Sequence, residues 1–139
     1  MNDSHRGARA VVEGLRDAMN AHDLEKLVAC FHDDVESVQP SHPSRSFKGR
    51  AQLRVNWTQI LGAIPDLRAD LLACVAGEHD AWAEWRWVGT RADGGRFEMC
   101  GVTVQTLRDG VIGSVRFFME PVDASAQPVG AAVRDVIGR

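Results

Sequence analysis

The first half of the chain carries apolar residues at helical spacing. They recur every three or four positions in three segments, which are therefore predicted to be helices: about 4–21, 24–31 and 50–63. Asp23 is placed to cap the second helix, and Pro65 prevents the third from continuing. Between them, residues 35–39 are expected to form a short strand and Pro40-Ser-His-Pro43 a loop. The first two helices are expected to form a hairpin.

After Pro65 the pattern changes to extended runs separated by turn residues. Four strands are predicted: 67–75, 81–90, 96–107 and 111–119. Short turns between successive strands indicate an antiparallel meander. Gly101 interrupts one run, where a bulge or sharp bend lets the sheet curl. Residues 123–139 form a tail whose spaced valines permit a last short helix.

The strand 81–90 has large apolar side chains on both faces. Strand alternation puts Trp82, Glu84 and Arg86 on one face and Trp85 and Trp87 on the other. We expect the first face to line a pocket, with Glu84 and Arg86 as a coupled pair; the alternative is an exposed ion pair. We expect the second face to pack against a second copy of the chain in a homodimer; the alternative is burial within one chain.

Composition limits the classes of function. A chain of 139 residues is the size of one domain, so 1–139 is treated as a single unit. The net charge of -3 provides no basic stripe for nucleic acid. No apolar run approaches the ~20 residues that span a bilayer, and the polar N-terminus indicates a cytoplasmic protein. The three cysteines lack metal-ligand spacing and are interpreted as buried hydrophobes, so no metal is expected.

Several segments together resemble a known family. They are Asn20-Ala-His-Asp-Leu24, Phe31-His-Asp-Asp-Val35, Phe47-Lys-Gly49, Glu84-Trp-Arg-Trp-Val-Gly-Thr90 and Asp109-Gly-Val-Ile112. The chain resembles the SnoaL-like polyketide cyclases of the nuclear transport factor 2-like superfamily, which includes the ketosteroid isomerases. The resemblance implies an α+β cone-shaped barrel, with three N-terminal helices on the concave face of a curved, mainly antiparallel sheet. It also implies an internal pocket for a small hydrophobic, carbonyl-bearing molecule, with no cofactor.

The resemblance also bears on individual residues. The proton-shuttling Asp of the isomerases falls on Gln39, whose amide cannot accept a proton near neutral pH. The chain has no Tyr for their oxyanion site, so a ketosteroid isomerase proper is not expected. The acid/base Asp of the cyclases matches Glu120. Strand parity puts Glu120 on the solvent side with Arg116, and a one-residue bulge would reverse that placement.

These considerations give a set of candidate site residues. Catalytic candidates are Glu84, Arg86 and Glu120; ligand-binding candidates are Gln39, Asn56, Trp57, Trp82, Cys100 and Met119. His42, in the loop after the first strand, is either a group at the pocket mouth or a solvated side chain. Two hypotheses follow: a cofactor-free acid/base cyclase or isomerase, and a non-catalytic small-molecule-binding domain. They differ in whether the carboxylates share one dry pocket with Gln39.

Overall fold

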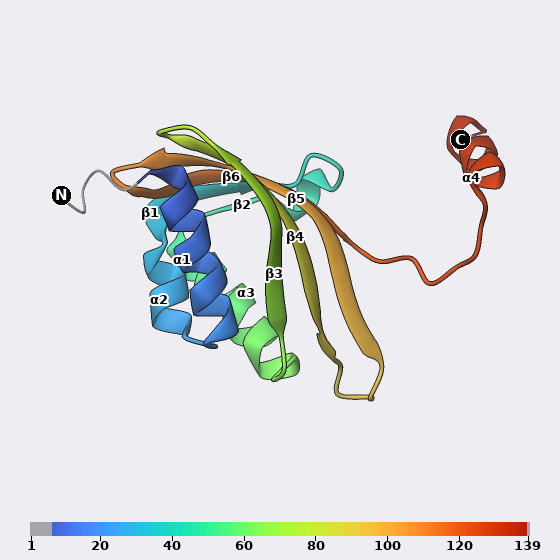
Figure 1. The fold of residues 1–139 in the computed structure, drawn as a ribbon, viewed down its shortest axis with the longest axis horizontal. Coiled ribbons are helices and arrows are strands. Elements are labelled where there is room, and N and C mark those ends of the chain that lie inside the picture. Colours follow the sequence, from blue (N-terminus) through green and yellow to red (C-terminus); the bar gives the residue numbers. More distant parts are fainter. Residues whose placement is uncertain (1–6, 139) are drawn as a thin grey trace.

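The computed structural model describes residues 7–138 as helices packed on one side of a curved, six-stranded sheet that does not close (Figure 1). The predicted fold class is confirmed. The elements are α1 (Ala8–Asn20), α2 (Leu24–Ala29), β1 (Phe31–Val38), η2 (Pro43–Arg45), β2 (Phe47–Lys48), α3 (Arg50–Ala63), β3 (Arg68–Ala76), β4 (Asp80–Thr90), β5 (Arg96–Arg108), β6 (Val111–Pro121) and α4 (Val129–Ile137).

The sheet has the strand order β2-β1-β6-β5-β4-β3. Strands β3 to β6 form the predicted antiparallel meander. β1 pairs in parallel with β6, which carries the first strand of the chain beside the last. β1 begins at Phe31, four residues earlier than predicted, because the second helix ends at Ala29. The two-residue strand β2 was not predicted.

The helices agree with the apolar periodicity. α3 has the predicted bounds, and the Asp23 side chain caps α2 by accepting a hydrogen bond from the Lys26 backbone N–H at 3.0 Å. Ser4, where the first helix is predicted to begin, lies outside the described residues.

The end of α1 is fixed to β3 by paired hydrogen bonds. The Asn20 side-chain amide donates to the Ala69 carbonyl at 3.0 Å and accepts from the Ala69 N–H at 2.7 Å. Ala69 is buried, so the pair satisfies backbone groups that would otherwise lose water without a partner. These contacts fix the C-terminal end of α1 against β3.

Gly101 lies at a close approach of β5 and β6. It adopts φ = +149°, and a Cβ atom added there would come within 2.7 Å of the Met119 Cα atom. The pairing of β5 with both neighbours continues in register through this residue. The predicted bend is therefore a tight backbone contact, and the register shifts lie elsewhere, between Leu71 and Ala73 and between Thr106 and Leu107.

The C-terminal segment leaves the sheet after Pro121. Residues 122–128 have no regular secondary structure, and the predicted last helix is present as α4, separated from the rest of the fold (Figure 1).

Candidate functional site: a neutral pocket on the concave face of the sheet

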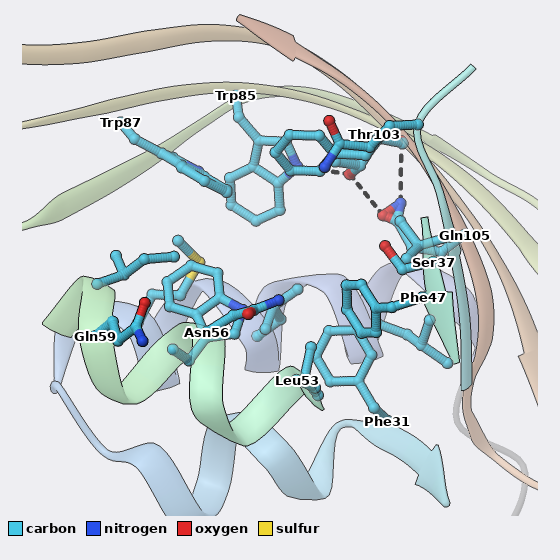
Figure 2. Close-up of a pocket in the computed structure, with 18 residues that line it drawn as sticks. Phe31, Ser37, Phe47, Leu53, Asn56, Gln59, Trp85, Trp87, Thr103 and Gln105 are labelled. Atoms are coloured by element: carbon cyan, nitrogen blue, oxygen red, sulfur yellow. Dashed lines mark hydrogen bonds between the residues drawn. The ribbon is translucent and has the colours of Figure 1, made fainter. Parts of the chain in front are cut away.

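A cavity of about 320 Å³ lies between α3 and the concave face of the sheet (Figure 2). Helices α1 and α3 supply one wall, and β1, β4, β5 and β6 supply the other. The lining residues are Leu15, Met19, Phe31, Ser37, Gln39, Phe47, Leu53, Asn56, Trp57, Gln59, Ile60, Trp85, Trp87, Thr103, Gln105, Ile112, Val115 and Phe117.

Aromatic rings pack in sequence along one side of the cavity. Trp87 is at the centre of this group, with ring centroids 5.5 Å from Trp57, 6.3 Å from Trp85 and 6.0 Å from Phe117. The two tryptophan pairs meet edge to face, the arrangement that aromatic quadrupoles favour. Such a wall provides a large apolar surface that loses little side-chain entropy when a flat molecule packs on it.

A buried hydrogen-bond network runs across the concave face of the sheet beside these rings. Trp85 Nε1–H donates to Thr103 Oγ1 at 2.8 Å, and Thr103 Oγ1–H donates to Gln105 Oε1 at 2.7 Å. The Gln105 amide donates in turn to the carbonyls of Thr103, at 3.0 Å, and Ala81, at 3.3 Å. Both Gln105 N–H groups and the Thr103 hydroxyl proton are thus used within the protein, so this network fixes the wall.

Four further polar side chains line the cavity, from Ser37, Gln39, Asn56 and Gln59. Asn56 Oδ1 accepts a hydrogen bond from Gln52 at 2.8 Å, which leaves its amide N–H groups for another acceptor. Within the part of the chain that the structure describes, the lining contains no Asp, Glu, His, Lys, Arg or Cys. The cavity is therefore apolar with neutral hydrogen-bonding groups.

The faces of β4 are opposite to our expectation. Trp85 and Trp87 are 1% and 5% exposed and line the cavity, whereas Trp82 is 55% exposed on the outer face of the sheet. Glu84 and Arg86 share that outer face by strand alternation, and neither lines the cavity. The prediction that their face lines the pocket is wrong, and so is the prediction that the Trp85 and Trp87 face contacts a second subunit. Strand alternation correctly assigned these residues to two opposite faces of β4. It could not decide which of the two faces the helices cover.

Glu84 and Arg86 also do not form the expected pair with each other. Arg86 Nε donates to Glu98 Oε2 at 2.9 Å, and Arg96 Nε donates to Glu98 Oε1 at 3.0 Å. Hydrogen bonds from these two guanidinium groups hold the pKa of the Glu98 carboxyl below its usual value, and the bond from Arg96 has the larger effect. This is an ion cluster on the outer face, remote from the cavity lining.

Glu120 lies on the solvent side, as strand parity indicated. Its pairing partner Cys100 and its neighbour Phe118 are also exposed. Glu120 Oε1 lies 2.6 Å from His42 Nε2, so the two residues form a side-chain pair at the surface. The His42 N–H donates to the Gln39 carbonyl at 2.9 Å, which puts this pair beside a residue of the cavity wall.

The predicted ligand-binding residues separate into two groups. Gln39, Asn56 and Trp57 line the cavity. Met119 is buried in the core without lining the cavity, and Cys100 is exposed on the outer face, contrary to the expectation that the cysteines are buried. The catalytic roles assigned to Glu84, Arg86 and Glu120 stay predictions.

Sequence analysis did not identify several polar residues of the cavity: Ser37, Gln59, Thr103 and Gln105. Thr103 and Gln105 alternate with Gly101 along β5, so a polar group repeated on one face of an otherwise apolar strand was the available signal. This pattern identifies cavity residues only once the inner face of the sheet is known. Trp85 pairs with Gly101, so Thr103 and Gln105 share the inner face with Trp85.

Residues 7–138 contain neither a metal-binding cluster nor a membrane-spanning helix. The structure brings together no group of three or more His, Cys, Asp or Glu side chains that could hold a metal ion. No helix in this range combines the length and apolarity needed to cross a bilayer.

Known structures share this arrangement of helices and sheet. A SnoaL-like protein of unknown function from Burkholderia thailandensis has a TM-score of 0.65 and 24% identity, over 84% of this chain and 94% of that one. IdmH of Streptomyces antibioticus, a candidate polyketide cyclase, has a TM-score of 0.69 and 21% identity, over 81% and 91%. RV0760c of Mycobacterium tuberculosis, solved in complex with estradiol-17beta-hemisuccinate, has a TM-score of 0.68 and 18% identity, over 78% and 90%. At these identities the likeness concerns the fold.

The same fold is found in a nuclear transport factor 2-like protein of unknown function from Exiguobacterium, with a TM-score of 0.67 and 20% identity, over 82% of this chain and 99% of that one. The sequence profile of the SnoaL-like domain matches residues 12–115, most of the chain. The chain therefore belongs to the SnoaL-like domain family. No curated protein matches it in sequence.

Proposed function

We propose that this chain binds a small, neutral, largely apolar molecule in the concave-face cavity and acts as a binding domain. The observation that carries the proposal is the lining itself, which combines aromatic rings with amide and hydroxyl groups and has no ionisable side chain among the described residues. A ligand charge buried there would lose its hydration without gaining a counter-charge, so neutral ligands are favoured. Carbonyl or hydroxyl groups on the ligand would pair with Ser37, Gln39, Asn56 or Gln59.

The same lining weighs against acid/base chemistry inside the cavity. A general acid or base must be within hydrogen-bond reach of the reacting proton, directly or through one water. Glu84 lies on the opposite face of the sheet, and amides do not exchange protons near neutral pH. Binding is therefore the function that the geometry supports best.

The binding test uses 9-fluorenone, a neutral aromatic ketone, and follows tryptophan fluorescence. Ser37→Leu adds an apolar side chain to the cavity wall and should abolish saturable quenching. Ser114→Leu is the matched control, because Ser114 precedes the cavity residue Val115 on β6 and faces the other side of the sheet. Equal binding by wild type and Ser37→Leu would refute a site in this cavity.

A second candidate function rests on the His42 and Glu120 pair. A histidine whose Nε2 atom lies 2.6 Å from a carboxylate has the geometry of an oriented proton-transfer group, and it lies in the loop beside Gln39. A substrate that extended past Gln39 would bring a reacting carbon toward this pair. Turnover of neutral polycyclic ketones that falls about 100-fold or more in Glu120→Gln, and not in Glu84→Gln, would establish it. Equal turnover in all three proteins, or none, would exclude it.

We also propose that the expected homodimer forms through the outer face of the sheet. Val75 of β3, Trp82 of β4 and Val104 of β5 are cross-strand neighbours there, with Phe118 on β6. Trp82 and Val75 are 55% and 73% exposed in the single chain. Large exposed apolar side chains on neighbouring strands favour a protein partner, and a second copy presents the same surface by symmetry.

A further inference from the structure

Within residues 7–138, no side chain covers the apolar face of the C-terminal helix α4. Val129, Val133, Val136 and Ile137 fall at i, i+4, i+7 and i+8, and all four are exposed. Figure 1 shows the helix held away from the body of the fold by the segment 122–128. A helix of nine residues that includes Gly130 is shorter than the ~12–15 residues at which isolated helices become stable in water. α4 therefore needs a packing surface.

An apolar groove of about 400 Å³ lies between the end of α3 and the turn that joins β4 to β5. Ile60, Ala63 and Ile64 line one side, and Ala92 and Phe97 line the other. The groove adjoins the ligand cavity, because Gln59 and Ile60 line both. A helix seated in the groove would lie against the α3 residues that also border the cavity.

The tail starts beside this groove. The Val122 N–H donates to the Glu98 carbonyl at 2.9 Å, one residue from Phe97 in the groove wall. The six residues 123–128 reach at most about 20 Å when extended. This length is enough for the chain to turn back and bring α4 over the groove of its own chain.

We propose that α4 folds back onto its own chain and seats its valine and isoleucine face in the groove, as a lid beside the cavity. The position of the tail identifies α4 as the segment that occupies the groove. The linker that carries α4 starts beside the groove, and the exposed apolar face of α4 matches the apolar lining of the groove. Ordering the linker opposes closure, so the lid opens and closes, and a molecule in the cavity adds surface for it to cover. The effect of the lid on ligand release rests on the proposed function. The docking of α4 in the groove is independent of it.

Disulfide trapping tests the docking without any ligand. Cysteine is introduced at Val133 together with Ala63 or Ala92, one on each side of the groove, with the three native cysteines replaced by alanine. A comparison variant combines Val133→Cys with native Cys100, which is exposed on the outer face of the sheet. At least one groove pair should form a disulfide within a single chain, and the Cys100 pair should not. Disulfides between chains, a preference for Cys100, or no groove disulfide would overturn the proposal.

Release of 9-fluorenone from the full-length protein tests the lid. Val133→Asp puts a charge on the apolar face of α4 and should speed release about tenfold or more, whereas Arg134→Asp, between the apolar positions, should leave release unchanged. Equal release from all three proteins would overturn the lid. If fluorenone does not bind at all, the proposed function fails, and the trapping result still decides whether α4 docks.

Discussion

Gly101 is the residue at which the close approach of β5 and β6, and with it the cavity wall, depends on the absence of a side chain. A Cβ atom at this position would meet backbone atoms of β6, among them the Met119 Cα atom at 2.7 Å. Backbone in a paired strand cannot rotate away as a side-chain end can. The φ of +149° adds conformational strain for any residue with a side chain.

We expect Gly101→Ala to destabilise the fold by about 3 kcal/mol, from overpacking of about 1–3 kcal/mol and backbone strain of similar size. For a domain of this length that loss lowers the melting temperature by about 10 °C. Gly101 pairs with Trp85, so the displaced strand also moves the cavity wall, and fluorenone binding should weaken in the folded protein.

Thermal and urea denaturation, followed by circular dichroism and by tryptophan fluorescence, measure the effect. Gly62→Ala is the control, because Gly62 lies within α3 with nothing within 4 Å of the added Cβ. That change should stabilise the protein by up to about 1 kcal/mol. A Gly101→Ala protein as stable as wild type would refute the reasoning that ties the close approach of β5 and β6 to this glycine.

Three other predictions concern the network, the outer face and acid stability. Thr103→Val should cost about 1–3 kcal/mol in urea denaturation, because it leaves Trp85 Nε1 without its acceptor in a buried site; no loss would show that the network is dispensable. Trp82→Asp should shift light-scattering mass from dimer to monomer without loss of fold, and an unchanged mass would reject the outer-face interface. The lowered pKa of Glu98 means that its ionised form stabilises the fold above the unfolded pKa. That contribution should disappear as pH falls from about 4 through the lowered value, so the melting temperatures of wild type and Glu98→Gln should converge in acid, and a constant difference would contradict the prediction.

The fold could be predicted because the apolar pattern and the turn residues indicate the same helices and strands. The apolar stripe of α3 ends before Pro65, and the turns after it are too short for anything but an antiparallel meander. The strand β2 and the parallel pairing of β1 with β6 were not accessible, since both depend on contacts between distant segments.

The site was predicted less well, for a reason visible in β4. Both of its faces carry tryptophan, so alternation alone could not decide which the helices cover. The presence of Glu84 and Arg86 beside Trp82 suggested a coupled site in a pocket. In the structure Arg86 finds Glu98 on the neighbouring strand at the surface, and the wholly apolar face of β4 is the one turned inward. Asn56 and Trp57, chosen from the apolar stripe of the third helix, and Gln39, chosen from the family resemblance, do line the cavity.

The four tryptophans provide the most direct test of a ligand site on the concave face. Each indole N–H gives a separate signal in a ¹H–¹⁵N spectrum, and single Trp→Phe variants assign the signals. On titration with 9-fluorenone, the signals of Trp57, Trp85 and Trp87 should shift together and saturate, while that of Trp82, on the outer face, should stay fixed. A shift confined to Trp82, or no shift at any indole, would contradict the account.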